Sequence, residues 1–161
     1  MDSVLAIGNV GGVNNEGSNM SKQKGTRNEK KVVDWFGDHG WYAQRTGGSG
    51  AGTADARPDV VAMRPNEYGR SDVVVAEVKG RDDGTVRFGK EDEHDELLQV
   101  ANQSGALALF ITSPDQRLSQ HEHMYAFKSE DLKENAKSYS VTGKMVEDAP
   151  SIGEVIESVF G

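Results

Sequence analysis

Several features that would define a chemistry are missing from this 161-residue chain. It has no cysteine, which excludes disulfide bonds, cysteine-bound zinc and thiol nucleophiles. It has no apolar run approaching the roughly 18 residues of a membrane-spanning helix. Its first residues lack the basic start and the long apolar stretch of a secretory signal. We therefore expect an intracellular, cytoplasmic protein.

An excess of positive charge is also lacking. The chain has 18 basic and 26 acidic residues, a net charge of −8, which by itself argues against a polyanionic partner. The distribution is uneven, because bases outnumber acids in residues 20–64, eight to five, and are outnumbered on both sides. This segment predicts a local basic patch, although a solvated helix face would give the same pattern. Its prominent bases are Lys22, Lys24, Arg27, Lys30, Lys31 and Arg45.

The hydrophobic pattern predicts an α/β protein. Residues 1–20 are rich in Gly, Asn and Ser and predict a disordered N-terminal tail. The elements that follow alternate between helical and strand patterns, which indicates a central mixed β-sheet flanked by helices. We expect one main domain over residues 21–128 and a C-terminal helical extension, 129–161, packed on it. Helices are expected at 24–38, 91–103 and 152–160, and strands at 41–46, 59–63, 72–79, 86–88, 106–112 and 124–128.

Two of these strands are joined by the polar turn 65–71 and are expected to form an antiparallel hairpin. If the turn centres on Tyr68, Asp59 lies opposite Glu77, about 5 Å away. Lys79 is two residues further along the strand and points to the same face as Glu77, whereas Val78 points towards the core. The hairpin therefore places two carboxylates and one ammonium together at its end.

Two carboxylates that share a site need a counter-charge. A hard divalent cation such as Mg²⁺ or Mn²⁺, which favours oxygen ligands, would supply it and allow both groups to stay ionised. The alternative is a simple salt bridge of Lys79 with Glu77 or Asp59.

The spacing of these residues, Pro58-Asp59 followed by Glu77-Val78-Lys79, resembles the PD-(D/E)xK motif of restriction-endonuclease-like nucleases. The flanking sequence extends the likeness. Gly25-Thr26-Arg27-Asn28-Glu29, Gly40-Trp41 and the glycine-rich run that begins at Arg45 occur in the order found in the archaeal Holliday junction resolvase family. The resemblance covers about residues 22–128, and it implies a restriction-endonuclease-like fold for a nuclease domain at 21–128.

The resemblance also implies roles for individual residues. Asp59 and Glu77 match the direct metal ligands, and Glu29 matches an acid of the first helix that completes the metal site. The backbone carbonyl of Val78 is a further ligand in this fold. Lys79 matches the catalytic lysine, and Ser49 matches a loop serine that contacts DNA near the cleavage site.

The implied function is a Mg²⁺-dependent endonuclease, with Mn²⁺ as a possible substitute, that acts as a homodimer on four-way DNA junctions. The resemblance also implies that basic side chains bind the phosphates of the DNA. Such contacts position the nucleic acid without reading its sequence, which suits recognition of junction shape. The residues implied for those contacts are Lys24, Arg27, Lys30, Lys31 and Arg45.

Other interpretations stay open at this stage. The same motif occurs in enzymes that cut ordinary duplex DNA, and a non-catalytic DNA-binding module could keep the fold. Thr26 and Glu29 have the spacing of a helix-capping box, which would give Glu29 a purely local role. The sequence of residues 84–90 is similar to a phosphate-binding loop. It lacks the Ser or Thr that follows the lysine of such a loop, and no strand is expected before it. The acidic charge could reflect a high-salt host, and His121 and His123 are expected to be exposed rather than zinc ligands.

Overall fold

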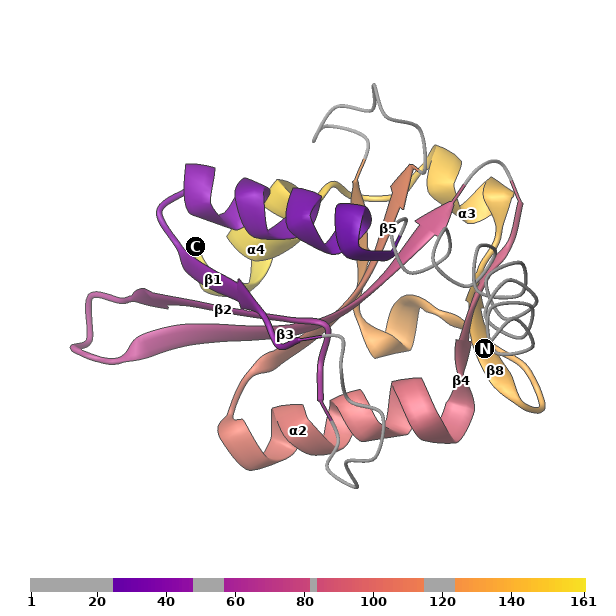
Figure 1. Ribbon diagram of the computed structural model, residues 1–161, viewed down its shortest axis with the longest axis horizontal. Coiled ribbons are helices and arrows are strands. Elements are labelled where there is room, and N and C mark those ends of the chain that lie inside the picture. Colours follow the sequence, from indigo (N-terminus) through magenta and orange to yellow (C-terminus); the bar gives the residue numbers. More distant parts are fainter. Residues whose placement is uncertain (1–24, 48–56, 82–83, 115–123) are drawn as a thin grey trace, which may run out of the picture.

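The computed structural model describes residues 25–47, 57–81, 84–114 and 124–161 (Figure 1). Its centre is a five-stranded mixed sheet with the strand order β1-β2-β3-β5-β6. The pairs β1–β2, β2–β3 and β5–β6 are antiparallel, and β3–β5 is parallel. The strands are β1 (Tyr42–Arg45), β2 (Val60–Pro65), β3 (Ser71–Arg81), β5 (Leu107–Pro114) and β6 (Tyr125–Phe127).

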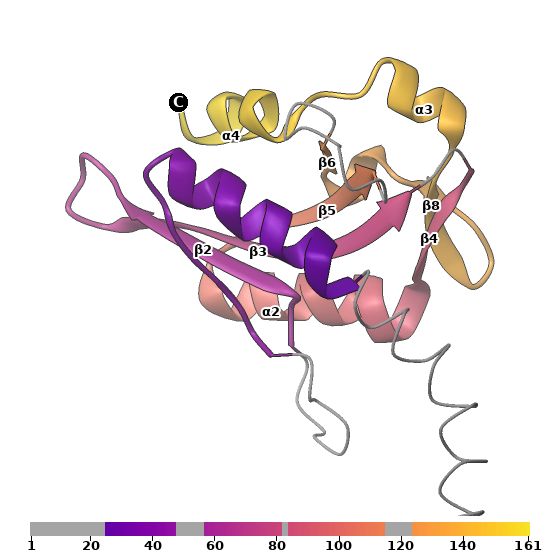
Figure 2. The same ribbon diagram turned by 45° about the horizontal axis from the view of Figure 1, so that its top comes forward.

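Helices cover both faces of this sheet (Figures 1 and 2). The helix over residues 25–38 and α4 (Ile152–Phe160) lie on one face and share an apolar cluster with it. The π-helical turn η1 (Lys90–Asp95) runs directly into α2 (Glu96–Ser104), which packs on the other face. The predicted fold class, a central mixed sheet flanked by helices, is therefore confirmed.

The side chains of β3 belong to both layers. Val74 and Ala76 pack into the cluster beneath the 25–38 helix, whereas Val75 packs into the cluster beneath α2. This alternation follows from the strand period of two residues. Further along the strand the α2 side changes character, because Glu77 and Lys79 occupy the positions where apolar residues would continue the pattern. The candidate functional groups thus begin where the apolar pattern of this face ends.

Most predicted elements are present with small shifts of their ends. The 25–38 helix, α4 and the short strand β4 (Val86–Gly89) lie where the pattern predicts them. The helix predicted from residue 91 is different, because residues 90–95 form a π turn and the α-helix begins at Glu96. Within the described part of the chain, no helix is long and apolar enough to cross a membrane.

The segment 129–161, which we predicted to be a helical extension, is not only helical. The segment also contains β7 (Lys133–Glu134) and β8 (Ser138–Val141), which pair with each other, and β8 pairs with β4 in a three-stranded sheet. Strands of two to four residues are too short to produce a recognisable alternation, so only their pairing identifies them. The helical parts of the segment are the 3-10 turn η3 (Ser129–Asp131), α3 (Gly143–Glu147) and α4.

The segment is nevertheless packed on the sheet. Leu132 and Val141 lie in the same apolar cluster as Phe88 and Phe110, and α4 contributes Ile152 to the opposite cluster. The C-terminal segment therefore supplies part of the core on both faces.

Candidate active site

The hairpin of β2 and β3 brings the two predicted acids together. Its register runs from Pro65 opposite Ser71 to Val60 opposite Ala76, which is the register predicted from a turn centred on Tyr68. One residue beyond this ladder, the Asp59 backbone N–H donates to the Ala76 carbonyl at 2.9 Å. Asp59 and Glu77 thus lie at the same end of the hairpin, next to the helix that carries Glu29.

The register of the hairpin brings the carboxyl groups of Asp59 and Glu77 together, and Asp59 perturbs the pKa of Glu77. Burial of Glu77, together with the charge of Asp59, raises the pKa of Glu77 to about 10. Asp59 is also held from the backbone, because the Val78 N–H donates to its Oδ2 at 2.9 Å. Without a cation, the pair therefore retains a proton at neutral pH.

Lys79 lies close to this pair but is bound to a different acid. Its Nζ is 2.8 Å from Oε2 and 3.0 Å from Oε1 of Glu93, in the π turn η1. The ammonium remains near enough to Glu77 to act against the rise of its pKa. The alternative prediction of a simple salt bridge is thus wrong about the partner, which is neither Glu77 nor Asp59 but Glu93.

Sequence reasoning did not identify Glu93. It belongs to the acidic run 91–96, whose charges suit the start of a helix. Nothing in the run distinguishes one acid from the others, because the distinction arises from a contact with a residue 14 positions earlier.

Glu29 approaches the pair from the 25–38 helix and is bound to Arg45. The Arg45 Nε lies 3.5 Å from Glu29 Oε1, and its guanidinium also donates to the Thr26 hydroxyl at 3.3 Å. Burial and the charge of Asp59 raise the pKa of Glu29, and Arg45 opposes this rise. The capping-box interpretation is wrong, because Gly25 is already helical and Thr26 therefore lies inside the helix.

The basic residues that we predicted to contact DNA differ in their exposure. Lys30 is exposed, whereas Arg27, Lys31 and Arg45 are half-buried. Arg45 forms an ion pair with Glu29, so its guanidinium already has a partner within the protein. Lys24 and Ser49 lie outside the described residues, as do Lys22, His121 and His123.

The donor set fits a hard divalent cation. Two carboxyls brought together, one of which keeps a proton, provide oxygen ligands with unneutralised negative charge. Within the described ranges, no group of three or more His, Asp or Glu side chains is gathered into a metal cage.

The tryptophans and the segment 84–90 have structural roles. Trp35 and Trp41 are buried in the core. Residues 86–89 form β4, so the segment that imitates a phosphate-binding loop is a strand paired with β8.

Comparison with known proteins identifies the class to which this fold and site belong. The sequence model of the archaeal Holliday junction resolvase family (Hjc) matches residues 20–160. Among solved structures, the chain resembles Hjc of Archaeoglobus fulgidus, a Holliday junction resolvase from an archaeal hyperthermophile. The TM-score is 0.66 and the sequence identity 24%, with 81% of this chain and 98% of that chain covered. No curated protein matches the chain.

The class is therefore that of the nucleases. More particularly, the chain belongs to the archaeal Holliday junction resolvase family, as its sequence motifs predicted. The match includes residues 129–160, the segment that contains β7, β8 and α4.

Proposed function

We propose that this chain is a divalent-metal-dependent endonuclease that resolves four-way DNA junctions by hydrolysing phosphodiester bonds. The observation that carries the proposal is the register of β2 and β3, which places the carboxyls of Asp59 and Glu77 together at the end of the hairpin. Two acidic groups brought together lower the stability of a folded protein, and such perturbed acids are frequent at functional sites, where a bound cation can offset their negative charge. Membership in the resolvase family supports the four-way junction as the substrate.

Mg²⁺ is the proposed cofactor, with Mn²⁺ as a substitute. Asp59 and Glu77 would hold the cation directly, and Glu29 and the Val78 carbonyl would complete its surroundings. When bound, the cation supplies charge neutralisation and activation of water for attack on phosphorus. This assignment rests on the acidity and the oxygen donors of the site, and on the resemblance for Glu29 and Val78.

The protein's own groups would prepare the site for this reaction. The Val78 N–H orients the Asp59 carboxylate, and Arg45 keeps Glu29 turned towards the pair by holding its carboxylate. Lys79 would contact the scissile phosphate or orient the attacking water, because its ammonium is close enough to Glu77 to lower the pKa of that carboxyl.

DNA would be held by the basic residues around the 25–38 helix. Lys30 is exposed and is proposed for phosphate contact, together with Lys24, Arg27, Lys31 and Arg45. Ser49 would contact DNA near the cleavage site. We further propose a homodimer, because a two-fold dimer matches the two-fold symmetry of a four-way junction and can make paired nicks. As its substrate is DNA, we expect the enzyme to act in the cytoplasm.

Cleavage of a labelled four-way junction and of a linear duplex with the same arm sequence tests this function. Each substrate is incubated with Mg²⁺, with Mn²⁺ and with EDTA. We expect paired nicks in the junction with either metal and none with EDTA. Equal cutting of the linear duplex would instead indicate a duplex endonuclease, and binding without cleavage in all conditions would indicate a DNA-binding module.

A further inference from the structure

We propose that Glu93 is a positioning residue, which holds the ammonium of Lys79 beside the Asp59–Glu77 pair and prevents it from collapsing onto that pair. The inference rests on the proposed function and adds a residue to its site. Glu93 acts through Lys79, and we assign it no contact with the cation or the DNA.

The geometry around Lys79 supports this role. Both carboxylate oxygens of Glu93 lie within hydrogen-bond distance of Lys79 Nζ, at 2.8 and 3.0 Å. Oε1 of Glu93 also accepts the backbone N–H of Gly89 at 3.1 Å, so the carboxylate is fixed from a second direction. The Lys79 Nζ lies 5.9 Å from the centre of the Phe88 ring, which limits its movement on another side. A flexible lysine side chain is thereby restricted to one region of the site.

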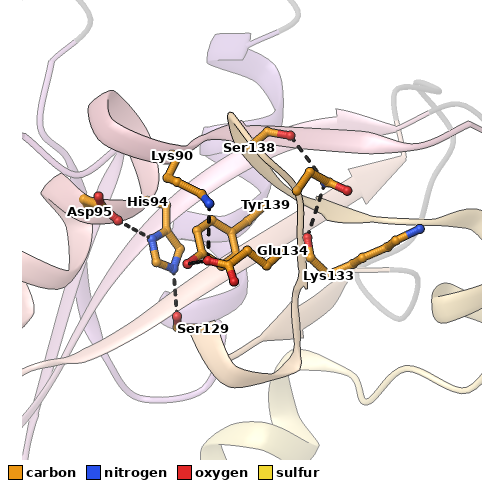
Figure 3. Close-up of polar contacts among 9 residues, drawn as sticks. Lys90, His94, Asp95, Ser129, Lys133, Glu134, Ser138 and Tyr139 are labelled. Atoms are coloured by element: carbon orange, nitrogen blue, oxygen red, sulfur yellow. Dashed lines mark hydrogen bonds and ion pairs between the residues drawn. The ribbon is translucent and has the colours of Figure 1, made fainter.

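The backbone that carries Glu93 is itself anchored. The next residue, His94, is 2% exposed and lies in the π turn η1. Its Nδ1 is 2.7 Å from Asp95 Oδ1 and its Nε2 is 2.7 Å from the Ser129 hydroxyl, as Figure 3 shows. The imidazole stacks on Tyr139 at 3.6 Å and on Phe110 at 5.2 Å. The C-terminal segment thus fixes the π turn, and the π turn fixes Glu93.

The charges explain why such a residue is needed. Asp59 and Glu77 form an acidic pair, the charge of Glu93 also raises the pKa of Glu77, and the ammonium of Lys79 lowers it. A lysine without another partner would move onto the pair and occupy the position where a cation neutralises it. Glu93 offers Lys79 a competing carboxylate, so the lysine stays near the pair while the two acids remain available.

Two measurements on the full-length protein test this inference. The first is the NMR signal of the Lys79 side-chain ammonium in metal-free protein, assigned by its loss in Lys79→Met. The second is the single-turnover rate of junction cleavage at saturating junction and Mg²⁺. The variant is Glu93→Gln. The matched control is Glu96→Gln, which makes the same charge change at an exposed position of the following helix.

We expect Glu93→Gln to shift or broaden the Lys79 signal and to lower the single-turnover rate by about 100-fold, the effect of a misplaced catalytic group. Junction affinity should change by less than about threefold, since the residue is not assigned to DNA binding. In the Lys79→Met background, Glu93→Gln should change the residual rate by less than about twofold, because the residue through which it acts is gone. Glu96→Gln should leave signal and rate unchanged.

An unchanged Lys79 signal, an unchanged rate, or a rate loss that persists in the Lys79→Met background would each overturn the inference. The last result would mean that Glu93 acts on folding or on the overall charge. Failure of the unsubstituted protein to cut the junction would refute the proposed function, and with it any role of Glu93 in that reaction. The NMR comparison needs no cleavage and decides separately whether Glu93 holds Lys79.

Discussion

The proton on the Asp59–Glu77 pair predicts an unusual pH dependence of stability. In the folded, metal-free protein the pKa of Glu77 is raised from 4.5 to about 10. A carboxyl with a raised pKa contributes its full stability below pH 4.5 and loses it as the pH rises towards 10, because the unfolded state ionises and the folded state does not. In this range the free energy of unfolding falls by about 1.4 kcal/mol per pH unit. Between pH 4.5 and pH 7.5 the free energy of unfolding therefore falls by at most about 4 kcal/mol.

Replacement of the titrating group isolates this contribution. Glu77→Gln keeps the size and hydrogen-bonding capacity of the side chain but cannot ionise, so the variant should be more stable than the unsubstituted protein at pH 7.5. The difference should shrink as the pH falls towards 5. Urea denaturation at several pH values between 5 and 8, with EDTA present, measures it, and Glu96→Gln serves as a control for a change of charge at an exposed site.

With Mg²⁺ bound, the unsubstituted protein should become more stable than the Glu77→Gln variant. Mg²⁺ must displace the proton from the pair, so its affinity for the unsubstituted protein should rise with pH and its stabilising effect should be larger at pH 8 than at pH 6. Glu77→Gln should gain little from Mg²⁺ at any pH. A stability difference between the two proteins that is the same at every pH, in EDTA, would refute the reasoning about the shared proton.

Three further predictions concern cleavage, folding and DNA binding. Asp59→Asn should lower the junction cleavage rate by about 10²- to 10³-fold while junction binding, measured by gel shift, survives; full activity would contradict the assignment. His94→Ala should lower the free energy of unfolding, measured by urea denaturation, by about 3 kcal/mol, since it removes a buried stacked ring. A loss under about 1 kcal/mol would show that the ring is dispensable for stability. Lys30→Ala should weaken junction binding and reduce the slope of log K against log salt by about 1. An unchanged slope would remove Lys30 from the DNA contacts.

The sequence predicted those parts of the site that depend on neighbouring residues in the chain. The polar turn 65–71 and the alternation of the two strands were sufficient to predict the register that brings Asp59 and Glu77 together. Register is strongly determined here, because a slip by one residue would turn Glu77 and Lys79 towards the apolar layer beneath the 25–38 helix. The order of motifs around this hairpin was also sufficient to identify the resolvase family.

Contacts between distant segments could not be predicted in this way. The partners of Lys79 and Arg45 were unknown until the structure placed Glu93 and Glu29 beside them. The strands β7 and β8 were missed for the same reason, since their pairing with each other and with β4 defines them more than their own residues do.

The amino-acid sequence alone thus determined the family, the layered α/β architecture and the pair of acids at the end of the hairpin. These features depend on hydrophobic periodicity and on turns of a few residues, which are local properties of the chain. The tertiary structure alone decided which charge each site residue faces, and therefore that Glu77 holds a proton and Lys79 is bound by Glu93. The strength of such interactions depends on separation and burial in space, and neither quantity can be read from the spacing of residues along the chain.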